Sequence, residues 1–207
     1  MSQSSAMIQK NKFIALLPSE ERQNSIFTIL KIYKKQIEGL TTTKWVYSTD
    51  YHITIGYMKS VDEHDVTSLL NAMTSSLPKV SSFKVTVSGV SFLGRSLTLL
   101  LEPNDTFQSI YQTLLQQVQM TTQDKYPFET KGHFLPHLTL GKIDRNNAPH
   151  LETRELISKM LSERYHHFSF DTESLCLMQS KNVEAGGKSR YETLQKYRLN
   201  PAQRAGP

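Results

Sequence analysis

The pentapeptide His52-Ile-Thr-Ile-Gly56 recurs in the other half of the chain as His137-Leu-Thr-Leu-Gly141. Each copy reads His, aliphatic, Thr, aliphatic, Gly, an alternation that is typical of a half-buried β-strand. Side chains of a strand point to opposite faces in turn, so each copy places its His and Thr on one face and its aliphatic residues on the other. A lone His-x-Thr is expected by chance about 0.5 times in a chain of this composition. Two matching copies therefore predict two related strands.

The elements around each copy follow the same order: a strand, a helix, the His strand and a second helix. Ahead of the first copy, Pro18 ends a buried strand, Ser19 caps the next helix, and Gly39 is expected to end it. We expect strands at 13–17, 51–58, 83–87, 97–101, 136–143, 174–179 and 191–199, a hairpin turn at 93–96, and helices at 19–39, 66–77, 107–118 and 152–165. This pattern predicts an α+β fold with two pseudo-symmetric lobes, each an antiparallel or mixed sheet with outer helices, around a central groove.

The composition indicates one folded and mildly basic unit. The chain has 207 residues, of which 38% are hydrophobic and 21% charged, and its formal net charge is +5. This length can bury a sizeable core. We expect a flexible tail at 1–11, a single bilobal domain at 12–199 and a flexible tail at 200–207. The positive balance favours an anionic ligand such as RNA or a nucleotide.

The cysteine content and the N-terminus point to a reducing compartment. Cys176 is the only cysteine, so no disulfide can form within the chain. Residues 1–12 lack the apolar core of a signal peptide, and no apolar run is long enough to span a bilayer. We expect a cytoplasmic monomer that does not contact a membrane.

The two His/Thr pairs suit chemistry at a phosphodiester. Displacement at phosphorus needs a base on the side of the entering oxygen and an acid on the side of the leaving oxygen. Histidine can fill either role because its unperturbed pKa is about 6.5. The Thr54 and Thr139 hydroxyls can donate to the non-bridging oxygens, where charge builds up. The scheme requires no metal or cofactor, and it leaves open which of His52 and His137 is the base.

Together the motifs resemble the two-histidine phosphoesterase superfamily, which includes LigT-like 2′,3′-cyclic phosphodiesterases and 2′,5′-phosphodiesterases. The opening strand Phe13-Ile-Ala-Leu-Leu17 and the closing segment from Leu177 through Tyr191-Glu-Thr-Leu194 are similar to the family's pattern as well. The resemblance implies two lobes with the motifs lining a central groove. It implies that His52 and His137 are the general acid and base, that Thr54 and Thr139 hold the phosphate, and that Lys142 stands where many LigT-like members carry Arg.

Further residues are candidates for binding the substrate. Tyr57, Phe134 and Tyr191 could stack on bases, as aromatic residues do with unpaired nucleotides, or could belong to the core. Lys142 is the best candidate for a phosphate contact. Four other cationic residues could line the same groove or simply be solvated surface charges: Lys59, Arg145, Lys188 and Arg190. Trp45, just ahead of the first His strand, is expected in the core.

The leading hypothesis is a metal-independent phosphodiesterase acting on RNA, an oligonucleotide or a cyclic nucleotide. The substrate is either a 2′,3′-cyclic phosphate or a 2′,5′-linked oligonucleotide such as 2′,5′-oligoadenylate, and the sequence does not choose between them. Two alternatives remain: an RNA- or nucleotide-binding module without turnover, and an ATP-independent 2′,5′ RNA ligase that runs the same transesterification in reverse.

Overall fold

The computed structural model describes residues 9–77, 80–128, 134–181 and 190–201. Strand β1 (Gln9–Pro18) already includes residues 9–11, which were expected in the N-terminal tail. Near the other end, Asn200 forms a β-bridge with Ser81. The remaining parts of both expected tails, and the glycine-containing part of the closing segment at 182–189, lie outside the described residues.

Four long helices form where the apolar periodicity predicts them. They are α1 (Glu20–Leu40), α2 (Val66–Ser76), α3 (Asp105–Thr122) and α4 (Leu151–Tyr165). Ser19 caps α1 by accepting a hydrogen bond from the Arg22 amide, as expected. The prediction that Gly39 ends this helix is wrong by one residue, since Leu40 is still helical and the extended residue Thr41 is the C-cap. Short 3-10 turns accompany the helices in the described part of the chain: η1 (Ser48–Asp50), η2 (Glu63–Asp65) and η4 (Arg145–Asn147).

The described strands form one eight-stranded sheet in which every paired strand is antiparallel. The strands besides β1 are β2 (Thr43–Trp45), β3 (Ile53–Asp62), β4 (Lys84–Leu93), β5 (Ser96–Leu101), β6 (His137–Ile143), β7 (Ser169–Ser180) and β8 (Tyr191–Arg198). Their order is β1-β3-β6-β5-β4-β7-β8, with β2 beside β6, and β7 also pairs with β1. The path thus returns on itself, and the junction between β3 and β6 is a single residue pair, Ile53 with Leu138.

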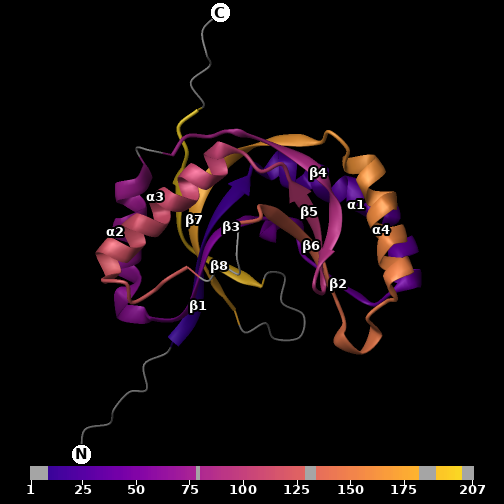
Figure 1. Ribbon diagram of the computed structural model, residues 1–207, viewed down its shortest axis with the longest axis horizontal. Helices are drawn as coiled ribbons and strands as arrows, with labels where there is room; N and C mark the ends of the chain where they lie inside the picture. The colour runs from indigo at the N-terminus through magenta and orange to yellow at the C-terminus, as the bar shows by residue number, and fades with distance from the viewer. Residues whose placement is uncertain (1–8, 78–79, 129–133, 182–189, 202–207) are drawn as a thin grey trace, which may run out of the picture.

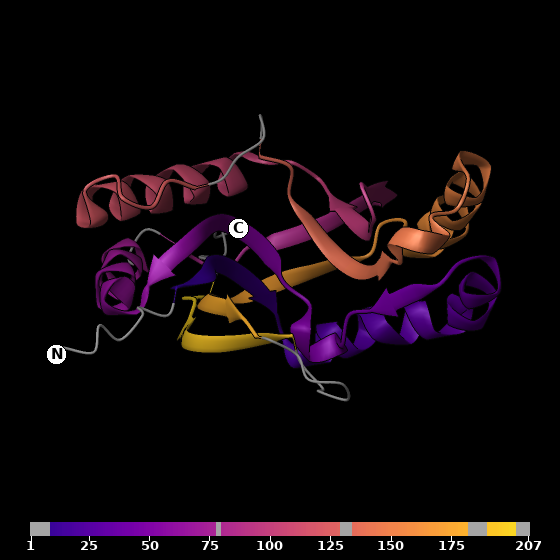
Figure 2. The same ribbon diagram turned by 90° about the horizontal axis from the view of Figure 1, so that it is seen from below.

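The molecule has two lobes, as predicted, and each lobe takes one helix from either half of the chain. Helices α2 and α3 pack together beside β1, β3, β7 and β8, while α1 and α4 pack together beside β2, β4, β5 and β6 (Figure 1). The view from below shows the same two helix pairs at opposite ends of the sheet (Figure 2). In each strand–helix–strand–helix repeat, the first helix packs against the second helix of the other repeat. Thus α1 packs against α4, and α3 packs against α2. No helix among the described residues is long and apolar enough to span a membrane.

The main hydrophobic core fills the space between the sheet and the helices. It includes Ile14 and Leu16 of β1 together with the buried stripe of α1, of which Ile26, Leu30 and Ile37 are fully enclosed. The alternate residues of β1 point to the other face of the sheet and join a smaller apolar cluster there: Phe13, Ala15, Leu17, Cys176 and Met178, with Tyr57 and Tyr191 packed against them. This second face is the one that carries the candidate functional residues.

Candidate active site

The two copies of the motif lie side by side at the junction of the lobes. Ile53 pairs with Leu138 in antiparallel register, and both side chains are fully buried in the main core. Continuing this register by one residue in each direction sets His52 opposite Thr139 and Thr54 opposite His137. These four side chains are half-buried and share one face of the sheet, which we call the histidine face. The arrangement has a local two-fold symmetry about the Ile53–Leu138 pair.

Both histidine rings are held in the same way. Nδ1 of His52 lies 2.6 Å from the carbonyl oxygen of Asp50, and Nδ1 of His137 lies 2.9 Å from the carbonyl oxygen of Leu135. A carbonyl oxygen only accepts hydrogen bonds, so each Nδ1 carries the hydrogen. In the neutral ring the lone pair is then on Nε2. The backbone thereby gives both rings the tautomer that acid/base chemistry at Nε2 requires.

A β-bulge occurs at the same position of both copies. Ala15 pairs with Thr54 and Ile14 with Gly56, so Ile55 is an extra residue on β3. On β6, Thr98 pairs with Thr139 and Leu97 with Gly141, so Leu140 is the corresponding extra residue. A bulge of this kind re-aims the side chains that follow it. Beyond each bulge the glycine therefore faces the main core, and the next residue, Tyr57 or Lys142, returns to the histidine face.

The two glycines make room for side chains of the core. A Cβ atom at Gly56 would overlap the Phe128 ring, and one at Gly141 would lie 2.8 Å from Cγ2 of Thr43 and 3.0 Å from the Trp45 ring. Both contacts would be far closer than van der Waals distance. The two glycines therefore do not face a ligand: the bulges turn them away from the histidine face, toward side chains of the core.

His52 stands in an aromatic environment. Its ring centroid lies 5.0 Å from those of Phe13 and Tyr191. Burial is the main reason that the pKa of His52 lies below its ordinary value; the bond to the Asp50 carbonyl and the nearby Asp50 carboxylate oppose this effect, and the positive charges of His137 and Lys142 add to it. The Asp50 carboxylate is itself anchored, because it accepts a hydrogen bond of 2.9 Å from the backbone amide of Arg190.

The strand that carries His137 leads to a cationic region. Beyond Thr139, β6 leads to Lys142, whose pKa is lowered by partial desolvation and by the charges of Arg190 and Arg95. Lys142 lies at the edge of an open cavity of about 370 Å³. Its charged lining consists of five cations, Lys44, Arg95, Lys142, Arg145 and Arg190, and one carboxylate, that of Asp144.

The structure brings most of the predicted substrate-binding residues to this region. Tyr57 and Tyr191 pack in the apolar cluster beside His52, and Lys142 lines the cationic cavity. Phe134 is elsewhere, because its ring stacks on Tyr111 at 5.4 Å and packs near Phe107 in the main core. Phe134 therefore packs against the core on the α3 side, the alternative that the sequence left open, and its contact with substrate stays a prediction. Trp45 also packs against the main core, as expected.

Some residues of the site were not identified from the sequence. Arg95 lies in the hairpin turn between β4 and β5, and it reaches the site because Ser96 pairs with Lys142. Lys44 reaches it because it pairs with Lys142 from the other side, on β2. Phe13 was expected only as part of a buried strand. The alternation of β1 is the signal that could have placed its ring on the histidine face. Lys188 lies outside the described residues.

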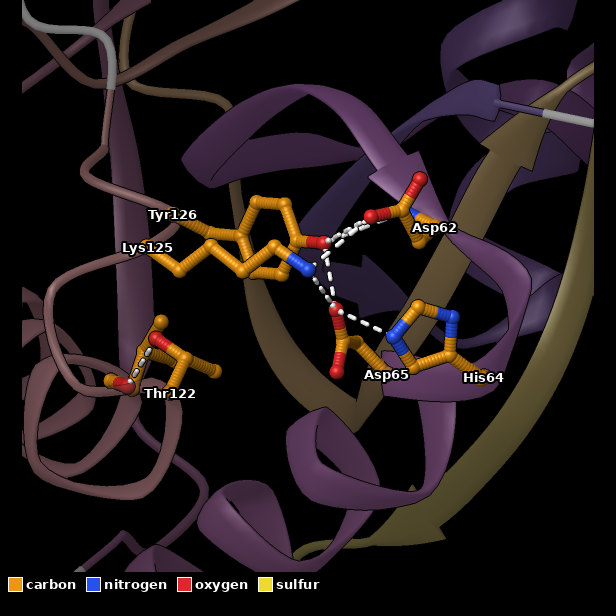
Figure 3. Close-up of polar contacts among 7 residues, drawn as sticks. Asp62, His64, Asp65, Thr122, Lys125 and Tyr126 are labelled. Atoms are coloured by element: carbon orange, nitrogen blue, oxygen red, sulfur yellow. Dashed lines mark hydrogen bonds and ion pairs between the residues drawn. The ribbon is translucent and has the colours of Figure 1, made fainter. Parts of the chain in front are cut away.

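A second polar cluster lies at the far end of β3, where Asp62, His64 and Asp65 have the residue types of a metal site (Figure 3). Its carboxylates are already engaged. The Lys125 ammonium lies 2.9 Å from Asp62 and 2.6 Å from Asp65, and the Tyr126 hydroxyl also donates to both. Hydrogen bonds from Lys125 and Tyr126 hold the pKa of Asp65 below its usual range. The cluster is thus an ion-pair network that ties η2 to the segment after α3.

Comparison with known proteins identifies the family. The fold is that of the LigT-like phosphoesterases: the chain superposes on Escherichia coli LigT complexed with 3′-AMP with a TM-score of 0.62 at 15% identity, covering 93% of this chain and 99% of that one. A protein of Thermus thermophilus gives a TM-score of 0.67 at 15% identity, with 93% and 100% covered. Residues 33–184 match the model of the 2′-5′ RNA ligase superfamily, and the chain belongs to this family. The resemblance inferred from the two motifs is confirmed.

A sequence relative carries a named activity. The chain is 26% identical over 136 residues to the RNA 2′,3′-cyclic phosphodiesterase of Thermotoga maritima, a match that covers 63% of this chain and 68% of that protein. This similarity supports a phosphodiesterase at the level of the reaction class. The substrate named for the relative, an RNA 2′,3′-cyclic phosphate, is established by this comparison for the relative alone.

Proposed function

We propose that the protein is a phosphodiesterase that uses His52 and His137 as an acid/base pair on RNA-derived substrates. The observation that carries the proposal is the matched anchoring of the two rings, each with Nδ1 bonded to the carbonyl two residues earlier. Such anchoring leaves Nε2 of each ring to exchange a proton with substrate. Two histidines anchored in the same way on neighbouring antiparallel strands suit proton transfer on the two sides of one phosphorus atom.

With a 2′,3′-cyclic phosphate, one histidine removes a proton from water as the water oxygen forms a bond to phosphorus. The bond from phosphorus to a ribose oxygen breaks, and the other histidine gives that oxygen its proton. The product is a phosphomonoester. With a 2′,5′-linked oligonucleotide, the neighbouring 3′-hydroxyl takes the place of water, and the 5′ oxygen leaves. Both versions need one neutral and one protonated imidazole at the start of the reaction.

The surroundings favour His52 as the base in the hydrolytic direction. The aromatic rings of Phe13 and Tyr191 and the lowered pKa keep its imidazole neutral at pH 7. A neutral ring with hydrogen on Nδ1 can accept a proton at Nε2. His137, bonded only to the Leu135 carbonyl among the described contacts, then serves as the acid.

In the proposed reaction, the two threonines and Lys142 stabilise the negative charge that develops on the phosphate oxygens. Among the described residues, nothing hydrogen-bonds to the hydroxyl of Thr54 or Thr139, so both can donate to a ligand. Lys142 adds a positive charge on the same face, beyond the second bulge. On the other side, the Tyr57 and Tyr191 rings offer a surface for a base.

A product analysis tests this proposal. Wild-type protein is incubated in EDTA with adenosine 2′,3′-cyclic phosphate and, separately, with 2′,5′-oligoadenylate. We expect conversion of the cyclic phosphate to a monoester, loss of activity in His52→Ala and His137→Ala, and unchanged activity in His64→Ala, a matched control in the far cluster. Tight nucleotide binding without product from either substrate would instead indicate a binding module.

The reverse reaction is a second candidate, because the matching family model is that of a ligase superfamily. The same two histidines can join a 2′,3′-cyclic phosphate to a 5′-hydroxyl, with the base acting on the hydroxyl instead of on water. Incubation of high concentrations of both ends, without ATP, measures this activity. A 2′,5′-linked product that requires both histidines would establish it.

A further inference from the structure

The cavity beside Lys142 carries more positive charge than a single reacting phosphate requires. Five cations line it against the one carboxylate of Asp144, and that carboxylate is already engaged by one of them, Lys44, and by a backbone amide. Asp144 lies 3.6 Å from the Lys44 ammonium and accepts the amide of Asn146 at 3.1 Å. Among the described residues, no carboxylate forms an ion pair with Arg95, Lys142, Arg145 or Arg190.

The strands explain why these cations converge. Lys142 lies between two partners on the same face of the sheet, with Lys44 of β2 on one side and Ser96 of β5 on the other. Arg95 precedes Ser96 in the hairpin, and Arg145 begins the turn that follows β6. Arg190 directly precedes β8, and its backbone amide donates a hydrogen bond to the Asp50 carboxylate. Such convergence brings like charges together, which is unfavourable without an anion.

The cavity lies next to the candidate active site along β6. Lys142 lines the cavity, lies on the histidine face, and contributes to the lowered pKa of His52. It follows Thr139 by three positions along β6, a separation of roughly 10 Å at most. No aromatic residue is among those that line the cavity, so a base has nothing to stack on there. Guanidinium groups suit bidentate contacts with phosphate.

We propose that this cavity binds a second phosphate of the substrate, the one on the 5′ side of the nucleoside whose phosphate reacts. The inference rests on the proposed phosphodiesterase function and specifies its substrate class: an oligonucleotide end or a 5′-phosphorylated nucleotide in preference to a nucleoside with one phosphate. The base then lies against the aromatic cluster beside His52, the reacting phosphate lies between the histidines, and the 5′-phosphate lies among Arg95, Arg145 and Lys142.

Two substrates that differ only in the 5′-phosphate test the proposal. They are adenosine 2′,3′-cyclic phosphate and the same molecule with a 5′-phosphate. We expect wild-type kcat/KM to be about 10-fold higher for the 5′-phosphorylated substrate, the gain from one charged hydrogen bond. Arg95→Gln and Arg145→Gln should each reduce this ratio severalfold. Arg22→Gln, an equal change of charge in a separate cavity on α1, should leave the ratio at its wild-type value.

Calorimetric binding of adenosine 3′,5′-bisphosphate and 3′-AMP provides a readout that does not depend on turnover. The bisphosphate should bind more tightly to the wild type, and Arg95→Gln should abolish most of the difference. Equal kcat/KM for both substrates, unchanged by either variant, would overturn the second phosphate site while leaving the phosphodiesterase proposal intact. Bisphosphate preference that depends on Arg95, without turnover of any substrate, would support the site and contradict the phosphodiesterase function.

Discussion

The two copies of the motif share a backbone but differ in the side chains around them. In both, the histidine bonds to a carbonyl two residues earlier, a bulge follows the threonine, and a glycine faces the core. After the glycine, one copy supplies Tyr57 to an apolar aromatic cluster, and the other supplies Lys142 to a cationic cavity. The shared His and Thr residues form a symmetric part of the site, which can bind the reacting phosphate. Tyr57 and Lys142 form an asymmetric part, which can orient the rest of the substrate.

The largest effects should come from the symmetric part. Thr54→Val and Thr139→Val each remove one donor to the phosphate, and we expect each to lower kcat by about 10² to 10³-fold. Because the two hydroxyls occupy equivalent positions, the two losses should be similar in size. Steady-state kinetics on a 2′,3′-cyclic nucleotide measure this. Wild-type kcat in either threonine variant would contradict the equivalent roles of the two hydroxyls.

The asymmetric part predicts two losses of different kinds. Tyr57→Leu removes a stacking surface and should raise KM about 5- to 100-fold with little dependence on salt. Lys142→Met removes a charge near phosphate, so its penalty should shrink as the salt concentration rises, and the slope of log(kcat/KM) against log[salt] should fall by about 1 unit. A salt series on both variants separates the two. Identical salt responses would contradict the division into an aromatic and a cationic side.

The glycines test the packing beneath the two copies. Gly56→Ala places a methyl group against the Phe128 ring, and Gly141→Ala places one against Thr43 and Trp45. We expect both to destabilise the fold by about 1–3 kcal/mol through overpacking, with Gly56→Ala the more harmful because its contact is closer. Urea unfolding measures the difference. In a Gly56→Ala protein, Phe128→Leu should restore part of the stability, and failure of that rescue would count against the assigned clash.

The smallest predicted effect concerns pH. His52 must be neutral to act as the base, so activity is lost as pH falls through its pKa, which burial lowers. The acid limb of kcat/KM should therefore lie below the ordinary histidine value of about 6.5. Tyr191→Ala opens the aromatic wall to water, which should raise this pKa and move the acid limb to higher pH. A limb that does not move would show that His52 is not the group that sets it.

The sequence predicted the four helices, every strand except the three-residue β2, and the four central residues, because short-range periodicity is enough to place them. It could not show the bulges at Ile55 and Leu140, since an extra residue in one strand is defined by its partner strand. The faces of Gly56 and Gly141 could therefore not be assigned from alternation alone. The role of Phe134 was also ambiguous, because the sequence near a motif does not show whether an aromatic side chain contacts substrate or packs against a core residue such as Tyr111. The convergence of Lys44 and Arg95 on Lys142 depends on pairings between strands far apart in sequence.

The most direct test of the central claim is a double-mutant cycle on the two histidines, with kcat measured for hydrolysis of a 2′,3′-cyclic nucleotide in EDTA. If His52 and His137 act as one acid/base pair, His52→Ala and His137→Ala should each lower kcat by about 10² to 10⁴-fold. The double variant should be little worse than either single one, because residues that act as a unit are strongly non-additive. A single variant that keeps near wild-type kcat, or losses that simply multiply, would contradict the claim.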